Sequence, residues 1–338
     1  MTGAGPSRFA DDRGMQNPYF PVVRTSTLRA SGVSKATVQG PQWQRRARGL
    51  LVPANTGLDA LTGRLGDAAA LATEGCAIGG WASFAVQGNP WLSGPDPEQV
   101  RDVLVHCPPG RQLRARTGIR PFRGLTYPDE MLDLDGLTVT TMARAAFDEM
   151  RLARSLREAV IALDMAISTA HGAPHTTLAR VAAVVGAHHK VKGLLRAQEA
   201  LPLASRRSAS PLETSTRLVL TRDVGVERVA VNVPVFSPAG DLLGIVDLLD
   251  LDSGLMVETD GEHHRDLIHH TKDNWREEKL ERAGAVVSRV TAWDHRDRLA
   301  LSARLNEARR AAGRIHDHRW TLAQPDWWRK WEPARRWD

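Results

Sequence analysis

The sequence predicts a multi-domain α/β protein, and three observations lead to that prediction. The chain has 338 residues, more than one hydrophobic core of ordinary size accommodates, so two or three domains are expected. Helical and strand-like hydrophobic periods alternate in the C-terminal third. No acidic residue occurs between Arg13 and Leu58, which sets a basic N-terminal segment apart. We expect a disordered leader at 1–20, a winged helix-turn-helix at 21–56, an α/β middle domain at 57–200, a linker at 201–209, a third domain at 210–312 and a Trp/Arg-rich tail at 313–338.

The composition narrows the class of partner and the compartment. The formal net charge of +6 favours a polyanionic partner. Cys76 and Cys107 are the two cysteines, so a disulfide framework is not expected and a reducing compartment is the default. No apolar run approaches the ~20 residues that span a membrane, and the polar N-terminus does not have the pattern of a signal peptide. We therefore expect a cytoplasmic protein without a membrane partner.

The basic N-terminal segment has the pattern of a helix-turn-helix with a wing. Residues 25–31 form a first helix, Gly32 lies in the turn, and Ser34 caps a second helix that runs to about 39. A short strand at 49–53 would form the wing. We expect the second helix to read a major groove of double-stranded DNA and the arginines to grip phosphates; the alternative is a solvated basic face. The expected DNA-binding residues are Arg24, Lys35, Thr37, Gln39, Arg45, Arg46 and Arg48.

The middle region predicts a mixture of helices and strands. We expect helices at 59–73 and 78–86 and a strand at 103–106. Ser155 and Glu158 form a capping box that begins a helix ending near 168. Residues 179–185 are apolar on too many sides to be exposed, so we expect them in the core.

The C-terminal third predicts the order helix, three strands, helix, strand, helix. Ser210 as N-cap and Pro211 at the first position begin a helix, with Glu213 three residues after the cap. Strands are expected at 229–236, 241–249 and 255–260, and Pro234 places the first of these at a sheet edge. A polar helix at 273–283 ends at Gly284, and a strand at 285–290 and a helix at 296–312 follow.

Acidic residues in these strands point to a metal centre. Asp247 and Glu258 fall on neighbouring strands, where two carboxylates ~4 Å apart repel by roughly 4 kcal/mol at an effective dielectric of ~20. A divalent cation between them would turn that repulsion into binding energy. Asp260 shares a strand face with Glu258, so Mg²⁺ or Mn²⁺ is predicted at Asp247, Glu258 and Asp260.

Each of these residues also has a simpler interpretation. Glu213 either serves the helix cap or assists at the metal, Asp247 could pair with an arginine, and Asp260 could belong to a turn. His263 or His264 would position water or protonate the leaving oxygen. A zinc site is the weaker alternative, because no ligand spacing fits it well.

The C-terminal pattern resembles the Vsr-like endonucleases of the PD-(D/E)xK superfamily. The resemblance covers roughly 205–312 and implies an αβββαβα fold that hydrolyses DNA phosphodiester bonds with a metal. The superfamily lysine, two residues after the glutamate, is Asp260 here; Vsr-like nucleases also lack it and use histidine. The matching residues are Glu213, Asp247, Glu258, Asp260, Gly261, His264, Arg276 and the segment 284–291.

The N-terminal segment resembles the winged-helix start of AbiEi-type antitoxin-like proteins. The matching stretches are 27–38 and 43–53, and the likeness continues into 79–88 and 137–148. It implies operator binding and transcriptional repression. Two hypotheses follow: a metal-dependent DNA endonuclease, or a sequence-specific repressor or antitoxin-like regulator whose nuclease fold has degenerated. Palindromic operators would favour a homodimer.

The C-terminal tail is rich in tryptophan and arginine. Interleaved aromatic and cationic side chains can stack on bases of a single strand, whereas the alternative is that the tail packs on the preceding domain or forms an oligomer contact. We favour packing. The tryptophans are Trp320, Trp327, Trp328, Trp331 and Trp337.

Overall fold

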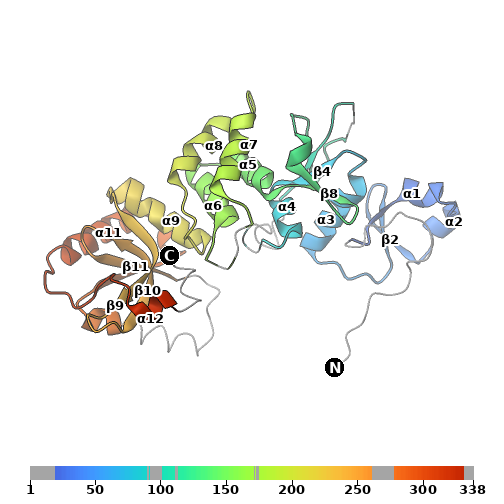
Figure 1. Ribbon diagram of the computed structural model, residues 1–338. Coiled ribbons are helices and arrows are strands. Elements are labelled where there is room, and N and C mark those ends of the chain that lie inside the picture. Colours follow the sequence, from blue (N-terminus) through green and yellow to red (C-terminus); the bar gives the residue numbers. More distant parts are fainter. Residues whose placement is uncertain are drawn as a thin grey trace. The chain divides into compact units, whose positions relative to one another are not determined.

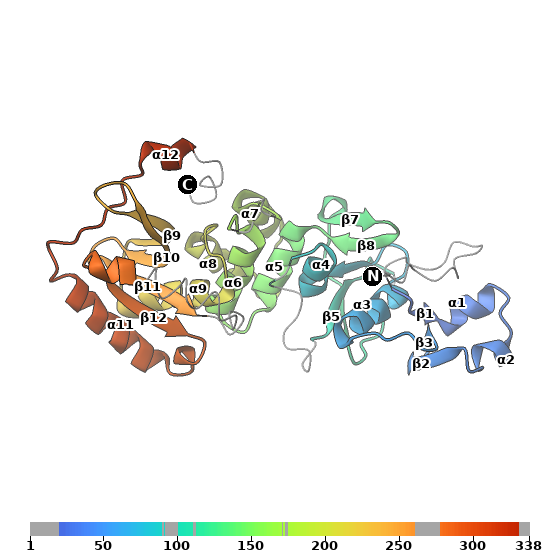
Figure 2. The ribbon, with the colours of Figure 1, turned by 90° about the horizontal axis from the view of Figure 1, so that it is seen from below.

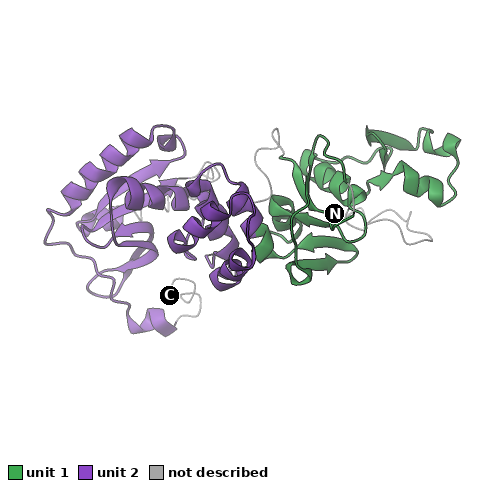
Figure 3. Ribbon diagram, turned by 90° about the horizontal axis from the view of Figure 1, so that it is seen from above, with its two compact units in different colours: residues 1–145 green, residues 146–338 purple. Residues whose placement is uncertain are grey.

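A computed structural model describes residues 20–89, 91, 101–110, 113–170, 172, 175–260 and 278–330. It shows a mixed α/β chain with three β-sheets (Figure 1). The chain divides into two compact units, residues 1–145 and 146–338 (Figure 3). The region 57–200, expected as one domain, therefore contributes to both units. No helix in the described parts of the chain is long and apolar enough to cross a membrane.

Unit 1 begins with a small module, residues 20–56, called the N-terminal module below. Its sheet has the order β1-β3-β2, and its two short helices are joined by a turn in which Gly32 has a φ of 89°. Ser34 caps the second helix as predicted, because its Oγ accepts the N–H of Thr37 at 3.0 Å. The elements are β1 (Val23–Arg24), α1 (Thr25–Ala30), α2 (Lys35–Val38), β2 (Trp43–Ala47) and β3 (Leu50–Pro53).

The rest of unit 1 surrounds a five-stranded sheet of order β6-β5-β4-β8-β7. The helix expected from Ile78 begins only at Gly80, and that expectation was wrong at its start. Residues 77–79 instead form a fully buried strand that pairs with β5 on one side and β8 on the other. The elements are α3 (Ala60–Leu71), β4 (Ala77–Gly79), α4 (Gly80–Val86), β5 (Val103–His106), β6 (Ile119–Phe122), η1 (Pro128–Glu130), β7 (Met131–Leu134), β8 (Leu137–Thr140) and α5 (Met142–Leu152), whose last residues belong to unit 2.

Unit 2 opens with helices that hold the segment expected to be a linker. Ser155 caps α6 as predicted, accepting the N–H of Glu158 at 3.2 Å. Asp164 of α6 is fully buried and accepts hydrogen bonds from the N–H of Ser205 at 2.7 Å and from Arg217 at 2.7 Å. Residues 201–209 are therefore anchored to α6. The elements are α6 (Leu156–Ile167), α7 (Leu178–Ala187), α8 (Leu194–Ala200) and η2 (Leu201–Leu203).

A four-stranded sheet of order β12-β11-β10-β9 follows. The strands are antiparallel except for β11 and β12, which are parallel. The expected order of elements is confirmed, with residues 278–282 as the described part of the middle helix, and β9 with Pro234 lies at the edge. Figure 2 shows α11 beside β12. The elements are α9 (Pro211–Val219), η3 (Leu220–Val224), β9 (Val229–Phe236), β10 (Leu242–Asp250), β11 (Leu255–Asp260), β12 (Val286–Thr291), η4 (Asp294–Arg296) and α11 (Arg298–Ala312).

The described part of the tail packs on this sheet. Thr321 exchanges two backbone hydrogen bonds with Phe236 of β9, at 2.8 and 2.9 Å. The helix α12 (Asp326–Lys330) buries Trp328 completely, with its ring 5.3 Å from that of Phe236. Packing is thus confirmed for the described tail, while Trp331 and Trp337 lie outside the described residues.

Candidate active site

Two of the predicted acids, Asp247 and Glu258, lie in a row of polar residues that crosses the four strands of the sheet of unit 2. The residues before and after Asp247 in β10 pair with residues of β9, and this register places Asp247 opposite Asn232. The antiparallel register of β10 with β11 likewise places Asp247 opposite Glu258. Glu258 is in turn the registered partner of Arg289 in β12. Asn232, Asp247, Glu258 and Arg289, called the polar row below, are therefore consecutive across the sheet.

At this row, β9 and β10 change which residues point to each face of the sheet. Residues two apart on a regular strand share a face, yet those flanking Asn232 and those flanking Asp247 pack into different clusters on the two faces. Asn232 has a φ of 51°, a left-handed conformation that asparagine tolerates better than most residues. The two clusters contain Val231, Leu248, Leu301 and Leu305 on one side and Val233, Val246, Met256 and Leu280 on the other.

The Asp247 carboxylate bridges β10 to β11. Its Oδ2 accepts the N–H of Thr259 at 2.7 Å and the Thr259 hydroxyl at 2.7 Å. The described backbone pairing of these strands reaches Leu248 and Val257. Just beyond that pair, the Asp247 carboxylate accepts a strand N–H in place of a backbone carbonyl. This bond holds the carboxylate beside Thr259, the residue that follows Glu258.

Glu213 approaches the row from α9. Its Oε2 accepts the N–H of Ala209 at 2.8 Å and the side-chain amide of Asn232 at 2.7 Å. Burial, followed by the negative charge of Asp247, raises the pKa of Glu213 to about 7. Glu213 therefore serves the helix cap, and it also lies close enough to Asp247 for the charge of that residue to act on it.

The remaining acids lie along β11. Glu258 is only 9% exposed, and Asp260 is half-buried opposite Thr291. No three His, Cys, Asp or Glu side chains among the described residues are grouped so as to hold a metal ion. The described acids alone therefore do not supply three protein ligands to one metal ion. His263, His264 and Arg276 lie outside the described residues.

A surface pair near the row was missed in the sequence. Trp293 follows β12 and is 70% exposed, and the Cζ of Arg296 lies 3.8 Å from the centroid of its ring. Thr291 is the registered partner of Asp260, the last predicted metal ligand, and Trp293 lies two residues after Thr291. A tryptophan within the polar stretch 292–298 was the available signal.

The predicted DNA-binding residues of the N-terminal module fall into two groups. Arg24 donates to the carbonyls of Ala70 and Leu71 at the end of α3, and Arg46 pairs with Asp67 at 2.8 Å. Those two arginines therefore fix the module to α3. Thr37 is exposed, but its hydroxyl lies 2.8 Å from that of Ser34. The exposed remainder comprises Lys35, Gln39, Arg45 and Arg48.

Comparisons with known proteins give the chain no relative. No family model, no curated protein and no solved structure matches it.

Proposed function

We propose that the chain is a Mg²⁺- or Mn²⁺-dependent DNA endonuclease. The observation that carries the proposal is the polar row, where Asp247 and Glu258 stand opposite each other on neighbouring strands and Glu213 interacts with Asp247. Placing acids this close inside a sheet costs folding free energy unless a cation binds there. A site for a divalent cation explains why the chain keeps them.

The topology of unit 2 supports this assignment. Three antiparallel strands follow a capped helix, and the fourth strand runs parallel to the third. The order agrees with the αβββαβα arrangement that the resemblance to PD-(D/E)xK nucleases implies. The acids also occupy the second and third strands of the sheet, as in that superfamily.

The residues present suit Mg²⁺ or Mn²⁺. Mg²⁺ usually takes one or two carboxylates and completes its shell with water and substrate phosphates, so Asp247 and Glu258 suffice as protein ligands. When bound, the ion lowers the pKa of water and stabilises charge on the phosphate.

The other side chains of the site have separate roles. Glu213, with a pKa of about 7, accepts a proton from the attacking water near neutral pH. His263 or His264 protonates the leaving oxygen. Arg289, the registered partner of Glu258, supplies the positive charge that the lysine replaced by Asp260 would have given.

The N-terminal module would bring the chain to DNA. Lys35, Gln39, Arg45 and Arg48 are exposed on its helix-turn-helix and wing, and no acid lies between residues 13 and 58. Such a surface binds phosphates through charge and leaves sequence selection to the side chains that reach base edges.

A plasmid assay tests the proposal. The full chain is incubated with supercoiled plasmid and Mg²⁺ or Mn²⁺, beside Asp247→Asn and the matched control Asp241→Asn, an exposed acid in the turn before β10. We expect metal-dependent nicking or linearisation that Asp247→Asn abolishes and Asp241→Asn retains. Intact plasmid with folded, DNA-binding protein would overturn the endonuclease.

The second candidate is a sequence-specific transcriptional repressor or antitoxin-like regulator. It is favoured by the exposed basic residues of the N-terminal module and by Asp260 in the place of the superfamily lysine. Selection of bound sequences from a random duplex library tests it, and a palindromic consensus would indicate a homodimer.

A further inference from the structure

The two cysteines of the chain face each other across neighbouring strands. Ala77 of β4 pairs with His106 of β5 in an antiparallel register, so the next position places Cys76 opposite Cys107. Directly opposed residues on antiparallel strands have Cα atoms about 4.5–5.5 Å apart, which lies inside the range of about 4.4–6.8 Å that a disulfide needs. Both thiols are free.

The two thiols influence each other. Burial, followed by the neighbouring Cys76 thiol, raises the pKa of Cys107 to about 11, and the Cys107 Sγ lies 3.5 Å from the Val105 carbonyl oxygen. Cys107 therefore carries its proton at neutral pH. Cys76 has a second partner, because its Sγ lies 3.4 Å from the Thr73 hydroxyl.

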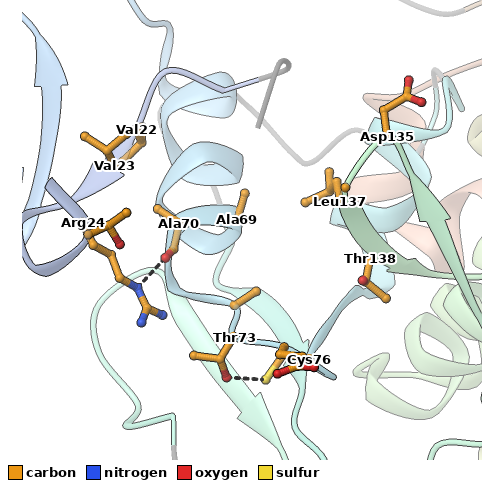
Figure 4. A pocket seen from close by; sticks show the side chains of 14 residues that line it. Val22, Val23, Arg24, Ala69, Ala70, Thr73, Cys76, Asp135, Leu137 and Thr138 are labelled. Carbon is orange, nitrogen blue, oxygen red and sulfur yellow. Dashed lines mark hydrogen bonds between the residues drawn. The ribbon is translucent and has the colours of Figure 1, made fainter. Parts of the chain in front are cut away.

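A cavity gives small molecules access to Cys76. It lies within unit 1, has a volume of about 390 Å³, and includes Arg24, Thr73, Cys76 and Leu137 in its lining (Figure 4). Cys76 itself is only 3% exposed, which excludes a large reagent but not a peroxide. Arg24 lines the same cavity as Cys76, and a nearby cation stabilises negative charge on a reacting sulfur.

We propose that Cys76 and Cys107 are an oxidisable dithiol that closes into a cross-strand disulfide when hydrogen peroxide enters this cavity. The Cys76 sulfur attacks one peroxide oxygen, the O–O bond breaks, and a sulfenic acid and one water form. The Cys107 sulfur then attacks the Cys76 sulfur, the S–O bond breaks, and the hydroxyl leaves as a second water with the Cys107 proton. Two thiols lose two electrons in total, and one peroxide becomes two waters.

The disulfide would act on the attachment of the N-terminal module. Cys76 directly precedes the central strand β4, and the cavity wall beside it contains Arg24, which joins β1 to the end of α3. A bond between the cysteines ties β4 to β5 next to that contact. Oxidation therefore rigidifies the wall against which the module rests, and a thiol reductant reverses it.

Intact mass and peptide mapping of the full chain test the proposal. The reduced, desalted protein is treated with one equivalent of hydrogen peroxide, and thiols are counted after denaturation. We expect loss of both thiols, a mass decrease of two hydrogens, one linked peptide pair containing Cys76 and Cys107, and full recovery with dithiothreitol. Two thiols that remain, or linkage between separate chains, would overturn it.

Single variants assign the roles and guard against a folding defect. Cys107→Ala should stop at a sulfenic acid on Cys76 that dimedone traps, whereas Cys76→Ala should react much more slowly. Circular dichroism confirms that each variant is folded. If both variants were oxidised at the same rate, the cavity would not direct the reaction and the assignment of Cys76 as the attacking sulfur would fail.

Discussion

The N-terminal module and the polar row both concentrate charge, but they place it in opposite surroundings. The module exposes Lys35, Arg45 and Arg48 to solvent, whereas the row sets the buried Glu258 beside Asp247. Exposed charges cost little to keep and act at long range, so they govern affinity and its salt dependence. Buried like charges cost stability in every folded molecule, so they indicate a site where a ligand or reaction offsets that cost.

The largest expected effect comes from neutralising the buried acids. Glu258→Gln keeps the shape of the side chain and removes its charge, so cleavage should fall by about 10³-fold, several kcal/mol of activation free energy. In EDTA the same variant should unfold at a higher temperature than the parent, because a buried like charge is gone. A plasmid assay measures the cleavage rate, and thermal unfolding measures the stability. Lower stability together with lost cleavage would make Glu258 a structural residue.

Arg289 should come next. If its charge stabilises the phosphate, Arg289→Ala lowers cleavage by about 10²-fold or more, while Arg289→Lys keeps most of the rate. Arg282→Ala is the matched control, because Arg282 is exposed and pairs at 2.9 Å with Glu278, four residues earlier in the same helix. Equal rates for the alanine and lysine variants would contradict a role based on charge.

The row also predicts a pH dependence of stability in the absence of metal. The pKa of Glu213 is raised from 4.5 to about 7, so the folded state binds more protons than the unfolded state between those values. Stability from this group is present below pH 4.5 and is lost as the pH rises to about 7, by at most ~1.4 kcal/mol per pH unit.

Urea unfolding in EDTA at pH 5, 6 and 7 measures that slope. Glu213→Gln should flatten it, whereas Asp241→Asn should leave it unchanged. If the parent protein and Glu213→Gln both became more stable as the pH rises across this range, the negative charge of Asp247 would not act on Glu213.

For the N-terminal module the expected effects are smaller and depend on salt. Arg45→Ala and Arg48→Ala should each weaken DNA binding and reduce the slope of log K against log salt by ~1. Arg46→Ala is the control, because Arg46 pairs with Asp67 and its loss should cost only about 0–1 kcal/mol of stability. Fluorescence anisotropy at several salt concentrations gives the slopes. Equal slopes for all three variants would remove the distinction between the exposed and the anchored arginines.

Local signals made the elements of unit 2 predictable. Ser210 and Pro211 mark the start of α9, Pro234 marks the edge strand, and Gly284 marks the end of the helix before β12. The acids were found for the same reason, since an acid inside an apolar strand stands out. Local patterns also gave Ser34 and Ser155 as caps.

Long-range pairing set the limits of that prediction. The opposition of Asp247 with Asn232 and the pairing of Glu258 with Arg289 depend on strand order, which composition and periodicity do not specify. Arg24 is basic and near a basic helix in sequence, yet it caps α3 some 46 residues away. The strand at 77–79 was missed because it has only three residues and continues directly into α4 at Gly80.

Trp293 gives the most discriminating effect, because it lies near the row but is exposed like the module. If its ring stacks on a base beside the cleaved bond, Trp293→Ala should weaken binding of single-stranded or distorted DNA by about 1–3 kcal/mol. Binding of an intact duplex, held by the module, should hardly change. Trp293→Phe should restore most of the loss, since a smaller aromatic face remains. Equal losses for duplex and single strand would assign Trp293 to general affinity, and unchanged binding of both would leave the row without an aromatic contact to its substrate.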